Sequence, residues 1–320
     1  MHIDSMLDSL AGLSVGDALG QQFPVMRRSL TQLRAGELPT ERPWAWTDDT
    51  EMACSVVAEL LRNGSIDQDR LAAAFARRFQ PHRDYGFNTV GVLRRIGAGA
   101  HWRDVAGALF ENQGSRGNGA AMRVAPLGAF YAGDPGRAAA EAARSAEVTH
   151  MHPEGVAGAV AVALAAAGAA RARLAGNRPG PAEFVDSVLG HLGDSETRGL
   201  IRRARSLLGA STQEAANELG NGSRVTAQDT VPFTIWAAAT HLGDYPAAVA
   251  TCIEADGDID TTGAIVGGIV AAHTGDRPGT GVPQWWLAAR EPLPGWFDPD
   301  RRPPRPSRFA RVRRRLAGPS

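Results

Sequence analysis

Two short acidic runs, far apart in the chain, carry the residues best suited to chemistry. Residues 46–50 read Trp-Thr-Asp-Asp-Thr, and residues 256–261 read Asp-Gly-Asp-Ile-Asp-Thr. Carboxylate and hydroxyl oxygens are the ligands that hard cations such as Mg²⁺ or Mn²⁺ prefer. Each run leads into an apolar helical pattern, where gathered like charges would repel without a cation. We therefore predict that the runs meet and hold a catalytic centre, with two cations about 3.5–4 Å apart.

Either run taken alone has a simpler interpretation. Asp48, Asp49 and Asp260 would be helix caps, while Asp256 and Asp258 would be turn residues at the surface. For a single run this interpretation has at least equal weight. The occurrence of two such runs favours the metal centre.

A glycine-rich run at 112–119 (Asn-Gln-Gly-Ser-Arg-Gly-Asn-Gly) precedes a helix that we predict from about residue 120. Successive exposed N–H groups ahead of a helix would bind a phosphate group. Glycine-rich turns before helices are common, so this signal is weak alone. The chain contains no lysine, which excludes a P-loop lysine and a Schiff-base lysine.

The run Thr-His-Met-His-Pro at 149–153 places His150 and His152 ahead of a long alanine-rich helix. This spacing suits zinc, a sugar hydroxyl or a phosphate, but a lone motif favours ordinary hydrogen bonds in a helix-entry loop. Cys54 and Cys252 lack a CxxC pattern and are predicted to be small buried filler. Without a disulfide framework or a recognisable signal peptide, a reducing, cytoplasmic setting is expected.

The elements that must position these residues are helices. No alternating strand pattern is present, and the fold class we predict is all-α, with one compact helical domain over 1–298 and an Arg/Pro-rich tail over 299–320. Asp48 or Asp49 is expected to cap one helix, and Asp67 to open the next. The helices are predicted near 5–20, 51–63, 67–80, 90–96, 102–110, 120–132, 136–148, 153–174, 182–192, 195–208, 212–219, 231–242, 246–254 and 260–273.

The formal net charge is +0 at pH 7, so nucleic acid and membrane surfaces are not expected partners, although the basic tail leaves nucleic acid as a minority interpretation. The apolar span 155–170 is predicted to be a buried core helix. A monomer is favoured.

The motifs together resemble the ADP-ribosylglycohydrolases, a group that includes dinitrogenase-reductase-activating glycohydrolase and the ADP-ribosyl-acceptor hydrolases. The resemblance covers roughly residues 8–275 and follows the family's motif order. Its residues are 16–20 (Gly-Asp-Ala-Leu-Gly), 46–50, 117–123 (Gly-Asn-Gly-Ala-Ala-Met-Arg), Thr149-His150 with Pro153, and 258–261.

This resemblance implies an all-helical fold with a two-metal cleft, and it assigns residues to two sets. The residues that match metal ligands are Thr47, Asp48, Asp49, Asp258, Asp260 and Thr261. The residues that match the ADP-ribose site are Tyr85, Gly86, Ser115, Arg116, Gly117, Asn118, Gly119, Met122, His150 and His152.

The implied reaction is hydrolysis of the α-glycosidic bond at the anomeric carbon of the distal ribose, with a carboxylate accepting a proton from water. Asp256 is the first candidate for that base, with Asp48 or Asp49 second. Many family members carry a glutamate shortly after the 16–20 motif, whereas this chain has no acid between residue 20 and Glu37.

The implied substrate is an ADP-ribosylated protein side chain, such as arginine or serine, or a small molecule. Alternatives are hydrolysis of a free metabolite such as O-acetyl-ADP-ribose, and a non-catalytic ADP-ribose-binding protein. The intact acidic set favours a hydrolase.

Overall fold

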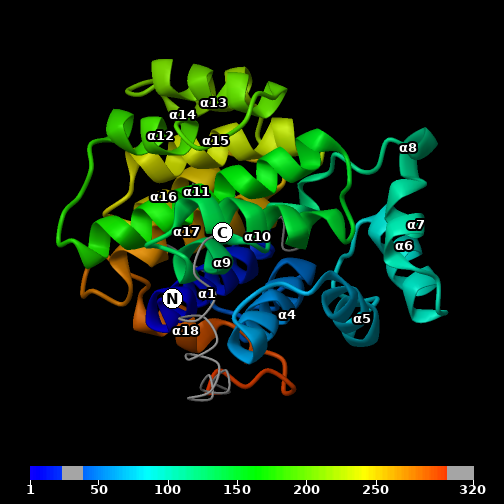
Figure 1. The fold of residues 1–320 in the computed structure, drawn as a ribbon. Helices are drawn as coiled ribbons and strands as arrows, with labels where there is room; N and C mark the ends of the chain where they lie inside the picture. Colours follow the sequence, from blue (N-terminus) through cyan, green and yellow to red (C-terminus); the bar gives the residue numbers. More distant parts are fainter. Residues whose placement is uncertain (24–38, 301–320) are drawn as a thin grey trace, which may run out of the picture.

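The computed structural model describes residues 1–23 and 39–300, and these residues form a single domain of packed helices without a sheet (Figure 1). The helices, labelled as in Figure 1, are α1 (Ile3–Gly20), α4 (Asp48–Asn63), α5 (Gln68–Arg78), α6 (Phe87–Gly97), α7 (Trp102–Gly107), α8 (Leu109–Asn112), η1 (Asn118–Ala120), α9 (Ala125–Phe130), α10 (Pro135–Glu147), α11 (Pro153–Leu174), α12 (Pro181–Leu189), α13 (Glu196–Ser206), α14 (Thr212–Leu219), α15 (Ala227–Thr240), α16 (Tyr245–Ala255), α17 (Ile259–Thr274) and α18 (Gln284–Ala289).

Helices α1 and α17 pack against each other with their backbones in contact. A Cβ atom added to Gly16 would lie 2.1 Å from the carbonyl oxygen of Gly263, and one added to Gly20 would lie 2.6 Å from that of Ile259. Only glycine permits so close an approach of two helices. The contact brings the last turn of α1 to the first turn of α17, although about 240 residues separate them in sequence.

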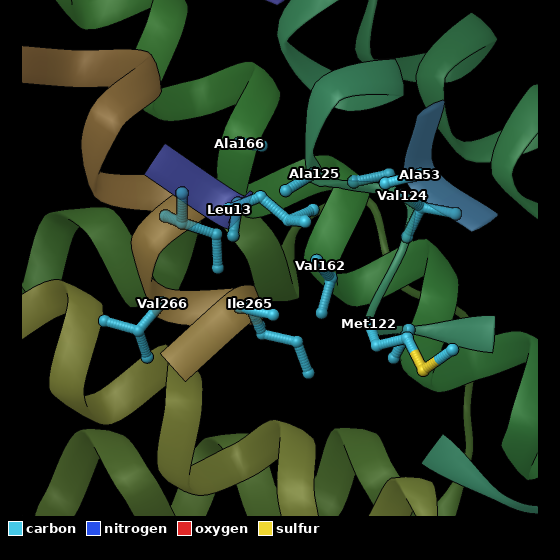
Figure 2. Packing of buried hydrophobic residues seen from close by; sticks show 14 of the residues in the cluster. Leu13, Ala53, Met122, Val124, Ala125, Val162, Ala166, Ile265 and Val266 are labelled. Carbon is cyan, nitrogen blue, oxygen red and sulfur yellow. The ribbon is translucent and has the colours of Figure 1, made fainter. Parts of the chain in front are cut away.

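The core lies around this pair, between α4, α9 and α11. Figure 2 shows Leu13 of α1, Ile265 of α17, Val162 of α11 and Ala125 of α9 among the buried side chains gathered there. The long helix α11 is the one described helix long and apolar enough to span a membrane, and 72% of its most apolar window is buried inside the protein. Such burial is typical of a core helix, which is what the sequence predicts.

The structure confirms the all-α prediction and most helix signals. Asp67 caps α5, Gly64 ends α4 in the left-handed conformation, and Pro153 occupies the first turn of α11. Ser211 accepts a hydrogen bond from the backbone N–H of Glu214 and so caps α14. Helix α18 has no counterpart among the predicted helices.

Three local predictions are wrong. Thr47, and not Asp48 or Asp49, is the N-cap of α4, because its hydroxyl accepts the backbone N–H of Asp49. The helix predicted from about residue 120 is a single 3-10 turn, and α9 begins at residue 125. The helix predicted over 102–110 stops at Gly107 because Phe110 has a positive φ of 48°.

One prediction lies largely outside the described residues: the Arg/Pro-rich tail predicted over 299–320 is described only to residue 300. Helices α6, α7 and α8 lie together at the right of Figure 1, beside the main body of the fold.

Candidate metal centre and ligand cavity

A cavity of about 820 Å³ opens where α1 ends and where α4 and α17 begin. Its lining comes from segments distant in sequence, including both acidic runs and the 114–119 loop. Five aspartates line it: Asp48, Asp49 and Asp84 come from the first half of the chain, and Asp258 and Asp260 come from the second. The two acidic runs therefore meet, as the sequence predicts.

Asp17 belongs to the same acidic group but lies behind the cavity lining. Its carboxylate is fully buried and accepts the backbone N–H of Thr47 at 3.1 Å and the Thr47 hydroxyl at 2.9 Å. It also accepts the N–H and the hydroxyl of Thr50, at 3.1 and 2.5 Å. Asp17 therefore fixes the first turn of α4, and it does so from the last turn of α1.

The carboxylates of Asp17, Asp49 and Asp260 each offer one oxygen, and these oxygens all lie within 4.8 Å of one another. Burial and the neighbouring Asp260 raise the pKa of Asp17 to about 7. Burial, followed by the charges of Asp17 and Asp260, raises the pKa of Asp49 well above its ordinary value. Carboxylates this close oppose one another's ionisation unless a cation lies between them.

The donor set fits a hard divalent cation. Oδ1 of Asp49 is buried and has no hydrogen-bond partner in the described part of the chain, whereas its Oδ2 lies 2.9 Å from the Thr47 hydroxyl. A buried carboxylate oxygen without a partner is costly, and a bound cation would satisfy it. The oxygens of Asp17 already accept hydrogen bonds from residues 47 and 50. Asp17 therefore holds the first turn of α4 in place and is a weaker candidate for a direct cation ligand.

Asp258 links the acidic cluster to the glycine-rich loop. It occupies the N-cap position of α17 but its side chain makes no cap hydrogen bond, and its Oδ2 instead accepts a 2.7 Å hydrogen bond from Nδ2 of Asn118. Burial and Asp260 raise the pKa of Asp258 to about 8. The interpretation of Asp258 as a surface turn residue therefore does not account for its burial or for its hydrogen bond to Asn118.

The 114–119 loop forms another wall of the cavity. Gly114 has a φ of 77°, and a Cβ atom there would lie 2.7 Å from the backbone nitrogen of His152, so the loop is pressed against residues 151–152. Within the described residues, the N–H groups of Ser115 and Arg116 donate to no protein atom. Bare amides of this kind can bind an anion, although the helix expected to follow directly does not form.

The two predicted histidines differ in role. His150 is 4% exposed and lines the cavity, and its Nδ1 lies 2.7 Å from the hydroxyl of Thr149. His152 also lines the cavity, but its Nδ1 accepts the backbone N–H of Glu154 and so caps α11. Met122 and Gly86 line the cavity as well.

Three predicted site residues lie outside this lining: Thr47, whose contacts are given above, Tyr85 and Asp256. Tyr85 is buried and donates a 2.6 Å hydrogen bond to Glu51. Asp256 is exposed at the end of α16, with a φ of 60°, and does not line the cavity. The roles assigned to these three residues from sequence stay predictions. Cys54 and Cys252 are buried free thiols, as expected.

Several residues at the site were not singled out from the sequence. Asp17 belongs to the 16–20 motif quoted above but was given no role, although a buried carboxylate in an apolar turn of a helix needs partners. The exposed rings of Phe87 and Phe110 and the loop residues Arg224 and Val225 had no signal in the sequence, since only the tertiary fold brings them to the cavity.

Comparison with known proteins gives one consistent result. The sequence model described as ADP-ribosylglycohydrolase matches residues 2–312. ADP-ribosylhydrolase ARH3 of Xenopus tropicalis is 29% identical over 327 residues, covering 88% of this chain and 90% of the relative. The Homo sapiens protein of that name is 29% identical over 331 residues, with 88% of each chain covered. A solved structure titled ADP-ribosylglycohydrolase-related protein complex is similar with a TM-score of 0.61 and 27% identity, covering 90% of this chain and 93% of that one.

Proposed function

Because the chain belongs to the ADP-ribosylglycohydrolase family, we propose that it hydrolyses the bond between ADP-ribose and an acceptor, with divalent cations held by its acidic cluster. Hydrolysis of ADP-ribose linkages is what the family supports. The observation that carries the cation dependence is the convergence of Asp17, Asp49 and Asp260, whose carboxylate oxygens lie within 4.8 Å of one another.

The cavity suits an elongated nucleotide sugar. Its volume of about 820 Å³ falls within the range of small-molecule sites, about 300–1,000 Å³. The acidic end offers acceptors for ribose hydroxyls, and the 114–119 loop offers N–H groups for a diphosphate. Phe110 lines the cavity with 55% of its surface exposed, which leaves its ring available to a base.

The proposed cation ligands are Asp48, Asp49, Asp258, Asp260 and Thr261, all of which line the cavity. Thr47, also predicted as a ligand, has its hydroxyl between Asp17 and Asp49, 2.9 Å from each. A bound divalent cation would supply a Lewis acid for the ribose hydroxyls and for a water molecule. The choice between Mg²⁺ and Mn²⁺ remains part of the test.

For the general base, the cavity lining favours Asp48 over Asp256. Asp48 lines the cavity, and burial followed by the charges of Asp260 and Asp17 raises its pKa well above the ordinary value. A general base must lie within hydrogen-bond reach of the water that it deprotonates, and a residue of the cavity lining meets this requirement. The surrounding negative charge would stabilise an oxocarbenium-like transition state.

The test is an incubation of the purified full chain with ADP-ribosylated arginine peptide, ADP-ribosylated serine peptide and O-acetyl-ADP-ribose, each with Mg²⁺, with Mn²⁺ and with EDTA. We expect cation-dependent release of ADP-ribose from at least one substrate. Release that persists in EDTA would contradict the cation dependence. No release from any substrate, together with tight ADP-ribose binding, would support the non-catalytic alternative.

A further inference from the structure

A chain of hydrogen bonds runs from the core to the ligand cavity through three side chains. Arg123 is fully buried, and its Nη2 donates to the carbonyl oxygen of Ser145 at 2.8 Å and to the hydroxyl of Thr149 at 3.0 Å. That hydroxyl oxygen lies 2.7 Å from Nδ1 of His150, which lines the cavity. Arg123 also lies against the ring of Phe75, 4.6 Å from its centroid.

The donor inventory of these groups fixes where each proton lies. A guanidinium group has only donors, so the Thr149 hydroxyl accepts from Arg123. The hydroxyl has a single hydrogen, and within the described residues its other partner is Nδ1 of His150. If Nδ1 were protonated, Arg123 and His150 would both donate to this hydroxyl, and its own hydrogen would have no acceptor among the described residues. The arrangement therefore favours a hydroxyl that donates to an unprotonated Nδ1. A neutral imidazole with an accepting Nδ1 carries its proton on Nε2.

The surroundings keep this imidazole neutral. Burial and the positive charge of Arg123 lower the pKa of His150 to about 3. Burial also lowers the pKa of Arg123, to about 9, so the guanidinium stays charged at neutral pH. The hydrogen bonds and the local charge are therefore both consistent with a neutral His150 ring that carries its proton on Nε2.

Nε2 of His150 faces the glycine-rich loop and the space above it. A Cβ atom at Gly117 would lie 3.1 Å from Nε2, and one at Gly119 would lie 3.2 Å from it. Within the described residues Nε2 makes no hydrogen bond. The absence of side chains at these two glycines therefore leaves the Nε2–H group available to a ligand.

We propose that Arg123 and Thr149 are positioning residues that hold His150 as its neutral Nε2–H tautomer, so that it donates one uncharged hydrogen bond to a phosphate oxygen beside the 114–119 loop. The choice of a phosphate oxygen rests on the proposed function, since it assigns that loop to the diphosphate of ADP-ribose. The protonation state itself does not depend on that function.

The first test is nitrogen NMR of the uniformly ¹⁵N-labelled full chain near pH 7, with the His150 signals identified by their loss in His150→Gln. We expect Nδ1 to be unprotonated and Nε2 to be protonated in the wild-type protein. A protonated Nδ1, alone or in a doubly protonated ring, would overturn the proposal. The protonation state is read from the unmodified chain, and the His150→Gln variant serves only to assign the signals.

The second test compares Thr149→Val, which removes the hydroxyl at similar volume, with Thr149→Ser, which retains it. We expect the valine variant to lose the single tautomer and to bind ADP-ribose and ADP about 3- to 10-fold more weakly by calorimetry, the effect of one hydrogen bond. The valine variant should bind adenosine, which has no phosphate, with the affinity of the wild-type protein. The serine variant should match the wild-type protein in its tautomer and in its affinity for all three ligands.

An unaltered tautomer in Thr149→Val, or equal losses in both variants, would overturn the positioning role. If adenosine binding weakens as much as ADP binding, the phosphate assignment is wrong. In catalysis, we expect Thr149→Val to raise KM and to leave kcat within about twofold of the wild-type value. The reason is that the Nε2–H group of His150 would bind the substrate equally well in the ground state and in the transition state. Absence of hydrolysis in every variant would count against the proposed function and leave the NMR result standing.

Discussion

The carboxylate of Asp17 accepts both the backbone N–H and the hydroxyl of Thr47, at 3.1 and 2.9 Å. One residue belongs to the last turn of α1 and the other is the N-cap of α4. Because the Thr47 hydroxyl also lies 2.9 Å from Oδ2 of Asp49, the position of a proposed cation ligand depends on a carboxylate in another helix.

We expect Asp17→Asn to weaken the metal centre and the fold together. The amide nitrogen would face the donors of Thr47 and Thr50, so buried charge-assisted hydrogen bonds worth about 1.5–3 kcal/mol each are lost. Urea unfolding with saturating Mg²⁺ should show a free energy of unfolding that is lower than that of the wild-type protein by at least about 1.5–3 kcal/mol. Asp4→Asn, at an exposed position of the same helix, is the matched control. An Asp17→Asn protein with full Mg²⁺ stabilisation would contradict the supporting role.

The stability of the metal-free protein should depend on pH in an unusual direction. The pKa values of Asp17 and Asp258 are raised to about 7 and about 8, above the ordinary value of about 3.9. The folded state therefore retains protons that the unfolded state releases, and this contribution to stability is present below about pH 4 and is lost as pH rises toward 8.

Denaturation in EDTA at pH 5 and pH 8, repeated with Mg²⁺, measures this effect. We expect Mg²⁺ to stabilise the protein more at pH 8, where the cluster is ionised. Asp258→Asn should reduce the difference between the Mg²⁺ stabilisation measured at pH 8 and that measured at pH 5. A larger Mg²⁺ effect at pH 5 would show that the acidic cluster is not the binding site.

Gly16→Ala should destabilise the protein by about 1–3 kcal/mol, because its methyl group would lie 2.1 Å from the carbonyl oxygen of Gly263 and overpack the α1–α17 contact. The matched control is Gly91→Ala inside α6, where nothing lies within 4 Å of the added methyl group. There we expect a gain of about 0.4–1 kcal/mol. Equal effects at both positions in thermal unfolding would contradict the close-packing argument.

Phe110→Ala should weaken ADP-ribose binding by about 1–3 kcal/mol, the value of one base stacked on an aromatic ring. Calorimetry with ADP-ribose measures the loss, and ribose 5-phosphate, which has no base, should show none. Leu174→Ala provides the protein control, since Leu174 is also 55% exposed but does not line the cavity. Unchanged ADP-ribose affinity would exclude Phe110 from the base site.

Much of the fold was accessible from sequence because its helices carry local signals. Asp67 acts within a turn of its own position, and its predicted role at the start of a helix is confirmed. The two acidic runs were recognised because each concentrates carboxylates at a helix start, although Thr47 took the cap position that was assigned to its neighbours.

The remainder depends on long-range contacts that no local pattern encodes. The cavity lining includes Phe110 because of a backbone reversal at that residue, and Tyr85 turns away from the cavity because Glu51 accepts its hydroxyl. The protonation of His150 depends on Arg123, 27 positions earlier in the chain, through a hydrogen bond visible only in three dimensions.

The contact between α1 and α17 joins two parts of the acidic cluster that the chain supplies far apart in sequence. Asp17 lies in α1 and Asp260 in α17, and the two helices pack through their glycines and through a 2.7 Å hydrogen bond from the Ser9 hydroxyl to the carbonyl oxygen of Gly268. A chain that ends before residue 260 would therefore carry a disconnected set of acids and could not form the proposed cation site.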